Sequence, residues 1–352
     1  MVAASEEVGN PSSVHGFGRR ARARLEDARE SIAEWLDVAP DRVTFVSGAT
    51  EANNLALAQA DGPVLASAIE HPSVLEAVPG TLRLPVEADG RVDPERCERL
   101  AAETGCGLVA VMLANNETGI VQPVREIARR LRRRGIRLHV DAAQVPGRLE
   151  FAFAELGADY LALSAHKFGG PPGIGALVAG PGIELRPLLR GGGQERRSRA
   201  GTENLPAACG FAAALRAIGR EEIRRIAELR DRLEAAVAGY PDVVIIGRNR
   251  PRLANTSCIL LAGIAADLLV MRLDLEGVAV GAGAACSSGK MAESHVLAAM
   301  GLPREIASCA IRVSLGWTTG EAEIAAFLAA FRKIRGELRD RPGLANPAPA
   351  TT

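Results

Sequence analysis

One lysine follows an apolar strand pattern, at a position where lysines are uncommon. In DYLALSAHKFGGPPGIGALVA (159–179) the strand pattern ends in Ser164, His166 and Lys167, after which glycine and proline break the regular structure. Partial burial there would lower the pKa of the Lys167 amine and make it reactive toward an aldehyde. Only three lysines occur among the 42 basic residues, so few amines compete for this role. A surface lysine after an edge strand is the alternative.

Two other strand patterns also end in groups that bind ligands. VTFVSGATEANN (43–54) runs from a strand through Ser-Gly-Ala-Thr into a helix, which offers backbone N–H groups and a hydroxyl to an anion. GIRLHVDAAQ (135–144) places Asp141 at the carboxyl end of an apolar strand, where open α/β sheets bind ligands. An ordinary helix cap and a buried structural aspartate are the plainer interpretations of these two segments.

The three segments together match the requirements of one cofactor. Pyridoxal phosphate (PLP) needs a lysine for its aldehyde, a carboxylate for its ring nitrogen and an anion site for its phosphate. Its protonated ring accepts electrons from a carbanion at the α-carbon of a substrate. The combination therefore predicts a PLP enzyme.

A cysteine lies in a run of small residues nearer the C-terminus. Residues 278–290 read VAVGAGAACSSGK, so the neighbours of Cys286 are mainly glycine, alanine and serine. Buried cysteines usually pack among bulky apolar side chains, and this segment has none beside the sulfur. The pattern indicates a thiol that is free to move, with an incidental thiol in a glycine-rich loop as the alternative.

The strand and helix patterns that must position these groups predict an α/β protein with two domains. Between about residues 20 and 205, short apolar strands alternate with helices, which indicates a largely parallel sheet covered on both faces. A long helical region (206–239) follows. Four strand patterns and further helices near 265–275, 294–300 and 320–336 then indicate a smaller α+β domain. The tail, RPGLANPAPATT (341–352), is expected to be disordered.

Composition limits the classes of partner and the cellular compartment. The 352 residues are 47% apolar and carry a formal net charge of +0, so nothing draws the chain as a whole to nucleic acid or to an anionic membrane. No apolar run reaches the roughly 20 residues that span a bilayer, and the start resembles no secretory signal. The six cysteines show no paired CxxC spacing, so neither a zinc site nor a disulfide framework is implied. We expect a soluble cytoplasmic protein.

The ordered set of motifs resembles the cysteine desulfurases of the NifS and IscS type, in the class V aminotransferase family of fold-type I PLP enzymes. The resemblance covers nearly all of residues 9–320, and it is carried by GNPSSVHGFGR, SGATEANN, IEHPSV, NNETGIVQP, HVDAAQ, SAHKFGGPPGIGAL, GGGQERRSRAGTEN, VAVGAGAACSSG and IRVSLG. It implies a large PLP-binding domain at 16–205 with a mostly parallel seven-stranded sheet. Residues 1–15 and 206–340 would form the small domain.

The resemblance also implies roles for individual residues. Lys167 would bind the cofactor aldehyde, Asp141 would bind the ring nitrogen, and His71 would stack on the ring and take part in catalysis. The positions that match cofactor contacts are Ala49, Thr50, Ser164 and His166 at the phosphate, and Asn116 and Gln144 around the ring. Thr202 would reach the phosphate of the neighbouring subunit's cofactor, which implies a homodimer. Arg312 would bind the substrate carboxylate through two parallel hydrogen bonds, and Asn10 would also contact the substrate.

The implied activity is conversion of L-cysteine to L-alanine, with transfer of the sulfur to Cys286 as a persulfide. Gly281, Gly283 and Gly289 keep the backbone permissive, so one thiol could meet the substrate and then a sulfur-acceptor protein or iron–sulfur scaffold. Cys258 and Cys309 lie in apolar runs and are expected in the core. A selenocysteine lyase, another lyase or transaminase of this fold, and a catalytically weak sulfur-relay partner remain as alternatives.

The start of the chain departs from the family pattern. Relatives carry an Asn/Ala/Thr-rich segment some twenty or more residues before the GNPSS motif, whereas here only MVAASEEV precedes Gly9. Either the start is misassigned or trimmed, or this member lacks a strand of the small domain and part of its substrate site.

Overall fold

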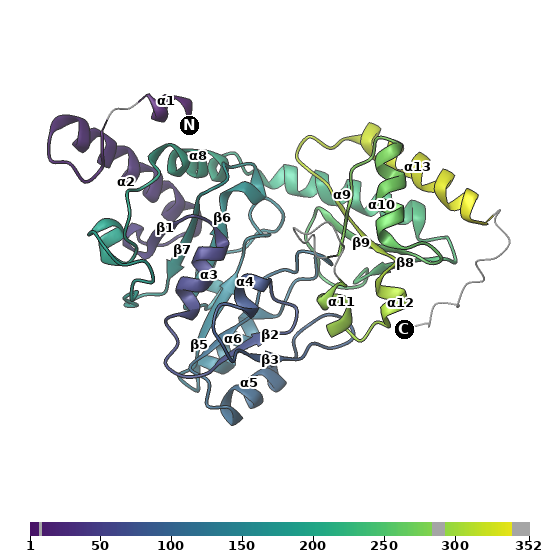
Figure 1. Ribbon diagram of the computed structural model, residues 1–352, viewed down its shortest axis with the longest axis horizontal. Helices are drawn as coiled ribbons and strands as arrows, with labels where there is room; N and C mark the ends of the chain where they lie inside the picture. The colour runs from purple at the N-terminus through teal and green to yellow at the C-terminus, as the bar shows by residue number, and fades with distance from the viewer. Residues whose placement is uncertain (7–8, 284–292, 340–352) are drawn as a thin grey trace. The chain divides into compact units, whose positions relative to one another are not determined.

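The computed structural model describes residues 1–6, 9–283 and 293–339, and it divides into two compact units (Figure 1). The first unit comprises Met1–Pro85, Val92–Leu113 and Gln122–Gly219. The second unit comprises Val86–Arg91, Ala114–Val121 and the chain from Arg220 onward. Residues 1–15 and 206–219, which we expected in the small domain, group with the first unit, because helices α1 (Val2–Ser5) and α2 (Gly16–Leu36) pack on α8 (Leu205–Arg216).

The first unit is built on a seven-stranded sheet, as predicted. Its strands are β1 (Val43–Val46), β2 (Val64–Ser67), β3 (Leu82–Leu84), β4 (Leu108–Ala110), β5 (Arg137–Asp141), β6 (Tyr160–Ser164) and β7 (Gly175–Ala179). Their order is β1-β7-β6-β5-β4-β2-β3. Pairing is parallel from β6 through β5, β4 and β2 to β3, and antiparallel where β7 meets β1 and β6. The sheet is therefore mostly parallel.

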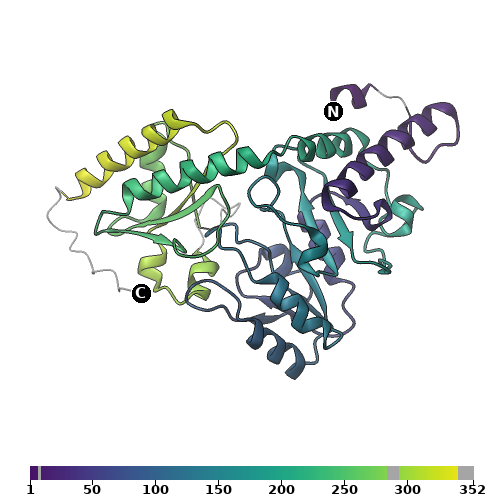
Figure 2. The ribbon, with the colours of Figure 1, turned by 180° about the vertical axis from the view of Figure 1, so that it is seen from behind.

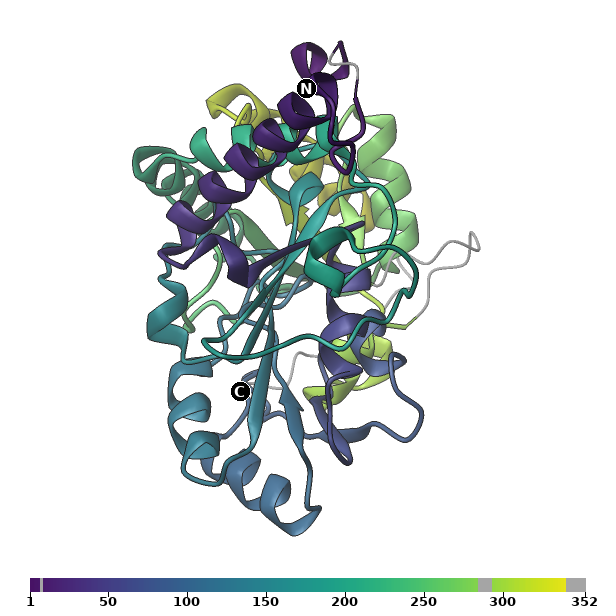
Figure 3. The same ribbon diagram turned by 90° about the vertical axis from the view of Figure 1, so that its left-hand side faces the viewer.

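Helices cover both faces of this sheet, as Figure 3 shows with α3 on one side of the strands and α5 and α6 on the other. The helices are α1 (Val2–Ser5), α2 (Gly16–Leu36), α3 (Ala49–Leu57), α4 (Pro72–Leu75), α5 (Pro94–Glu103), α6 (Val124–Arg132), α7 (Phe153–Leu156) and α8 (Leu205–Arg216), with 3-10 turns η1 (Pro40–Arg42), η2 (Ala165–Phe168) and η3 (Gln194–Arg197). Strands buried from both sides explain the unbroken apolar runs in the sequence.

The long helical region predicted at 206–239 is two helices. α8 ends at Arg216 and α9 (Arg220–Val237) begins four residues later, beyond Gly219. Glycine is a poor helix former, so the chain can break there at little cost. The break is also the boundary between the two units.

The second unit is a four-stranded antiparallel sheet with helices packed on it (Figure 2). Its strands are β8 (Val243–Ile246), β9 (Thr256–Leu261), β10 (Gly281–Ala282) and β11 (Ala310–Ser314), in the order β10-β11-β9-β8. Its helices are α9, α10 (Ala266–Leu275), α11 (His295–Ala299), α12 (Arg304–Ala307) and α13 (Glu321–Arg339). α13 packs against both α9 and α10.

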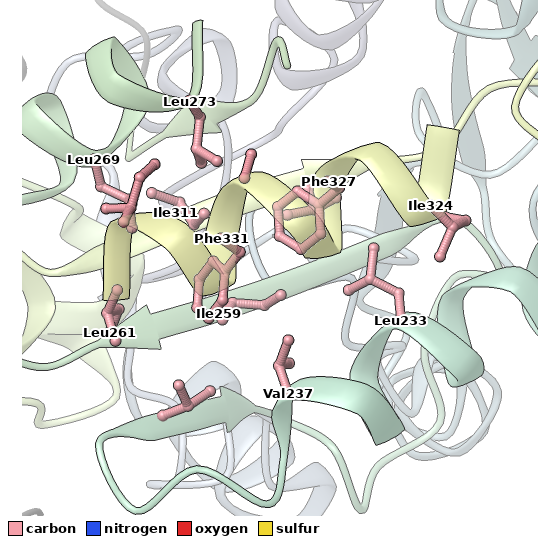
Figure 4. Close-up of a cluster of buried hydrophobic side chains, with 14 of the residues drawn as sticks. Leu233, Val237, Ile259, Leu261, Leu269, Leu273, Ile311, Ile324, Phe327 and Phe331 are labelled. Carbon is pink, nitrogen blue, oxygen red and sulfur yellow. The ribbon is translucent and has the colours of Figure 1, made fainter. Parts of the chain in front are cut away.

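A cluster of aliphatic and aromatic side chains forms the core of the second unit (Figure 4). Phe327 and Phe331 of α13 stack with their ring centroids 5.6 Å apart, and Ile259 and Ile311 come from the adjacent strands β9 and β11. Full burial of one such side chain is worth about 1.5–3 kcal/mol. This cluster fixes β11, the strand that carries Arg312.

No helix among the described residues is long and apolar enough to cross a membrane.

Candidate active site

Sheet register brings three strand ends to one edge of the first unit. β5 and β6 are parallel neighbours, with Asp141 opposite Ala162, so Asp141 and Ser164 close adjacent strands at the same end. Val46 and Ser164 both lie opposite Gly175, so the end of β1 is in the same row. The sheet therefore gathers the groups that the sequence placed at separate strand ends.

Close approach of two backbones shapes the turn between β1 and α3. A Cβ atom at Gly175 would lie 2.5 Å from Leu163 O and 2.7 Å from Gly48 Cα, so only glycine fits there. A Cβ atom at Gly48 would in turn lie 3.6 Å from Ser164 Oγ. These contacts place the first residues of α3 beside the Ser164 hydroxyl.

The start of α3 has the features of an anion site. Gly48 is its N-cap and supplies no side-chain cap, and Ala49 and Thr50 are its first residues. Ser164 Oγ lies 3.0 Å from His166 Nδ1. Burial, and next the charge of Lys167, lower the pKa of His166, so its imidazole is neutral at pH 7. Helix N–H groups, a hydroxyl and an imidazole are suited to a phosphate.

Asp141 is buried and held by two uncharged donors. Its Oδ2 accepts a hydrogen bond from Asn53 Nδ2 at 2.8 Å, and its Oδ1 accepts one from Ala143 N at 2.8 Å. Each carboxylate oxygen has a second lone pair, so the group keeps capacity for further donors. A protonated ring nitrogen is a donor of that kind.

His71 caps a short helix on an exposed loop. Its Nδ1 accepts a hydrogen bond from Ser73 N at 3.1 Å, which makes it the N-cap of α4. The same nitrogen lies 2.8 Å from Ser73 Oγ. The cap fixes the start of α4, and with it the position of the imidazole.

Lys167 lies on the turn η2, three residues beyond the buried end of β6. Its side chain is exposed, so the expected partial burial is not observed. The chain leaves the buried strand at Ser164, and Lys167 lies in the turn that follows rather than at the strand end itself. Arg148 orders this segment, since it donates to Lys167 O, to Gln144 O at 3.2 Å and to Gln144 Oε1.

The residues of the first unit fit PLP. The uncapped start of α3, with Ser164 and His166, matches the phosphate, and Asp141 matches the ring nitrogen. Lys167, on the turn after Ser164, carries the amine that an aldehyde requires.

Arg312 and Asn116 belong to the second unit, where Arg312 Nη1 donates to Asn116 O at 3.0 Å. Arg312 is half-buried on β11, opposite Gly281 of β10. A Cβ atom at Gly281 would lie 3.2 Å from Arg312 Nη2, so the glycine leaves room for the guanidinium. Arg312 is therefore not an exposed residue of the strand.

The other predicted site residues are exposed or lie outside the described residues. Asn10 and Thr202 are exposed, and Asn10 Oδ1 accepts a hydrogen bond from Ser12 N at 2.8 Å within its own turn. Cys286 lies in the segment 284–292, outside the described residues.

Of the remaining thiols, Cys97 and Cys258 are buried, and burial raises the pKa of each to about 12. Both thiols therefore stay protonated at neutral pH. Cys258 lies in the core as predicted. Cys309 is only half-buried, because it lies in the turn before β11 and not in the strand.

Four residues that support the site were missed in the sequence. Asn53 and Arg148 bind predicted site residues directly. Arg199 forms an ion pair with Glu51 in the first turn of α3, with Nε 2.8 Å from Oε1. Asn53 and Glu51 stand inside the SGATEANN motif, and Arg199 stands inside GGGQERRSRAGTEN, so motif membership was the only signal.

Comparison with known proteins gives a consistent assignment. The aminotransferase class V family model matches residues 3–327. The chain is 41% identical to a cysteine desulfurase of Cereibacter sphaeroides, over 95% of this chain and 90% of that protein. It is 38% identical to the cysteine desulfurase IscS of Dictyoglomus turgidum, over 95% of this chain and 89% of that protein.

A solved structure agrees with these matches. The NifS-like protein of Rickettsia africae superposes with a TM-score of 0.88 at 34% identity, covering 95% of this chain and 94% of that one. Enzymes of this family depend on PLP, and the fit of the first unit to that cofactor agrees. The chain belongs to the class V aminotransferase family, among the cysteine desulfurases of the NifS and IscS type.

Proposed function

We propose that this chain is a PLP-dependent cysteine desulfurase that converts L-cysteine to L-alanine and passes the sulfur to Cys286. The observation that carries the proposal is the row of strand ends in the first unit, where Asp141 and Ser164 meet the uncapped start of α3. A PLP enzyme needs this combination, and the desulfurase relatives supply the choice of substrate.

The residues of the first unit would hold and activate the cofactor. When bound, PLP supplies an electron-accepting ring that stabilises negative charge at the α-carbon of an amino acid. Asp141 would accept a hydrogen bond from the protonated ring nitrogen, and His71 would lie against the face of the ring. The Lys167 amine would bind the aldehyde and, once released by the substrate, would take the proton from the substrate α-carbon.

Residues of the second unit would bind the substrate. The planar guanidinium of Arg312 presents paired donors that match the substrate carboxylate. Its Nη1 is already anchored on Asn116 O, and Gly281 leaves the space beside Nη2. Asn10, a residue of the first unit, would also contact the substrate, and Gln144 would contact the cofactor ring.

The sulfur step would use Cys286 as its thiolate. Its Sγ would attack the substrate sulfur, forming the S–S bond of a persulfide as the bond from Cβ to sulfur breaks. The carbon fragment would keep the electron pair of that bond, take up a proton and leave as alanine. The persulfide would then pass its terminal sulfur to an acceptor protein, such as an iron–sulfur scaffold.

We further propose a cytoplasmic homodimer in which Thr202 reaches the cofactor of the partner copy. The exposure of Thr202 supports this assignment.

The test is alanine released from L-cysteine, with added PLP and a thiol reductant. Lys167→Ala should abolish turnover, while the control Lys333→Ala, which removes an exposed ion pair with Glu276, should keep it. Cys286→Ala should bind PLP, with its visible absorption, and should release no alanine. Wild-type alanine release by Cys286→Ala would refute its role, and a parallel assay with L-selenocysteine would identify a selenocysteine lyase.

A further inference from the structure

Asn53 is a fully buried amide on the inner face of α3, and it has no role in the proposed function. Its Nδ2 lies 2.8 Å from Asp141 Oδ2 and 2.9 Å from Ser73 Oγ. Its Oδ1 lies 2.8 Å from His139 Nε2. One carboxamide therefore contacts three polar groups on two different elements, β5 and α4.

The donors and acceptors of this network have one consistent arrangement. The Asp141 carboxylate accepts, so Asn53 Nδ2 faces it and Oδ1 faces His139. Burial lowers the pKa of His139 to about 3, so the ring is neutral and carries a single N–H. That hydrogen must be on Nε2, because a carbonyl oxygen only accepts. His139 thus fixes the orientation of the Asn53 amide.

The second hydrogen of the amide extends the network to His71. Asn53 Nδ2 donates to Ser73 Oγ, so the Ser73 hydroxyl hydrogen is available to His71 Nδ1, 2.8 Å away. Ser73 N also donates to that nitrogen at 3.1 Å. Both contacts require His71 Nδ1 to accept, so the ring hydrogen of His71 is on Nε2.

We propose that Asn53 is a positioning residue that sets the Asp141 carboxylate and the tautomer of His71 together, through one amide. The proposal rests on the proposed function, because it assigns Asp141 to the ring nitrogen of PLP and His71 to its face. The two groups that would hold opposite parts of the cofactor ring are then coupled through a side chain that touches neither the cofactor nor the substrate.

The chemistry requires an amide at this position. An aspartate would place a second carboxylate beside Asp141, and the two could not both ionise at low cost. An alanine would remove a donor from Asp141 and leave the His139 N–H without its acceptor in the core. Only a side chain with both a donor and an acceptor satisfies the three contacts.

The chain offers a matched control in Gln59, a second buried amide two residues beyond the end of α3. Its Nε2 donates to Leu55 O at 2.8 Å and to Arg186 O at 2.9 Å, and its Oε1 accepts from Arg186 N at 2.8 Å. Gln59→Ala removes as many hydrogen bonds as Asn53→Ala, and its partners are not site residues.

The experiment compares Asn53→Ala, Asn53→Asp and Gln59→Ala by PLP affinity, by the pH dependence of the visible absorption of bound PLP without substrate, and by thermal unfolding. We expect both Asn53 variants to weaken PLP binding about tenfold or more and to shift the pH at which the absorption change of bound PLP is half complete, its midpoint. Gln59→Ala should lose stability and keep the wild-type affinity and midpoint.

Ser73→Ala separates the two arms of the network, because it breaks the link to His71 and leaves the bond to Asp141. It should shift the absorption midpoint less than Asn53→Ala does.

The acid range gives a second signature. The titratable groups around position 53 are Asp141 and His139 of β5, His71 at the start of α4, and Glu70, whose pKa the charge of Asp141 helps to raise. PLP affinity of Asn53→Asp should recover in part as the pH falls and its carboxyl gains a proton that it can donate. That of Asn53→Ala should not recover.

Two results would overturn different statements. If the wild-type chain with added PLP showed no visible absorption that Lys167→Ala removes, the proposed function would be overturned, and this inference with it. A wild-type chain that releases alanine, with Asn53 variants that match Gln59→Ala in affinity and midpoint, would overturn the role of Asn53 alone.

Discussion

Replacement of Glu195 by alanine tests the buried ion pair that anchors the segment before Thr202. The Glu195 side chain is 1% exposed, and its two carboxylate oxygens accept from Arg29 Nη1 at 2.7 Å and Nη2 at 3.0 Å. A third bond comes from Phe45 N at 2.9 Å, on β1. The segment is thereby tied both to α2 and to the sheet that carries the candidate site.

The backbone at this anchor is strained. Residues 195, 196 and 197 have φ values of 47°, 53° and 68°, a left-handed run of three residues that are not glycine. Each such residue costs on the order of 1–2 kcal/mol. The buried ion pair must offset this cost, so its loss should release the segment.

The expected loss follows from the partners that remain. Without the carboxylate, Arg29 keeps Val43 O and Glu26, while its side chain stays only 3% exposed. Removal of one partner of a buried pair costs about 3–5 kcal/mol. Relaxation of the strained run recovers part of this, so we expect Glu195→Ala to lower the free energy of unfolding by about 3 kcal/mol.

Urea unfolding of the protein without added PLP measures the loss. The matched control is Glu155→Ala, which breaks the pair between Arg125 and Glu155, whose side chains are 70% and 60% exposed. The control should cost at most about 1 kcal/mol. PLP affinity should also fall in Glu195→Ala, because Arg199 in the same segment holds Glu51. A Glu195→Ala loss no larger than that of the control would refute the reasoning.

Three further outcomes are expected. Burial raises the pKa of Glu70 to about 8 from the ordinary 4.5, so the folded state keeps a proton that the unfolded state has lost. As the pH rises from 4.5 to 8, the free energy of unfolding of the wild type should thus fall by at most about 1.4 kcal/mol per pH unit, and that of Glu70→Gln should not. The same pH dependence for both proteins in urea unfolding would contradict this. The Cβ atom of Gly175→Ala would lie 2.5 and 2.7 Å from main-chain atoms, so this variant should weaken PLP binding and lower the unfolding temperature. Gly336→Ala in α13, the control, should raise the unfolding temperature. Gly281→Val should displace the Arg312 guanidinium and raise KM for L-cysteine several-fold more than it lowers kcat; an unchanged KM would count against that substrate role.

The strand ends could be predicted from the sequence because their signal is local. An unbroken apolar run followed by polar residues marks the carboxyl end of a buried parallel strand, and this located Asp141 and Ser164 correctly. The expectation for Lys167 failed because the same signal gives no direction to the turn after the strand.

The supporting contacts could not be predicted, because they depend on how elements pack. Glu195 lies 166 residues from Arg29 in the chain, and no local pattern marks their pairing. The spacing from Ala49 to Asn53 places both on one side of a helix, yet the partners of Asn53 are known only once α3 lies on β5. Left-handed backbone at residues that are not glycine likewise has no sequence signature.

The electrostatics around Asp141 follow from the burial of its neighbours. His139 is neutral because burial lowers its pKa to about 3, and Glu70 is largely protonated at neutral pH because burial raises its pKa to about 8. The donors that Asp141 receives, Asn53 Nδ2 and Ala143 N, are also uncharged. A cationic neighbour would neutralise the carboxylate, and an ionised Glu70 would add a second negative charge near it. In the proposed role of Asp141, neutral surroundings would leave its negative charge to act on the cofactor, so the burial of His139 and Glu70 would serve the chemistry as well as the fold.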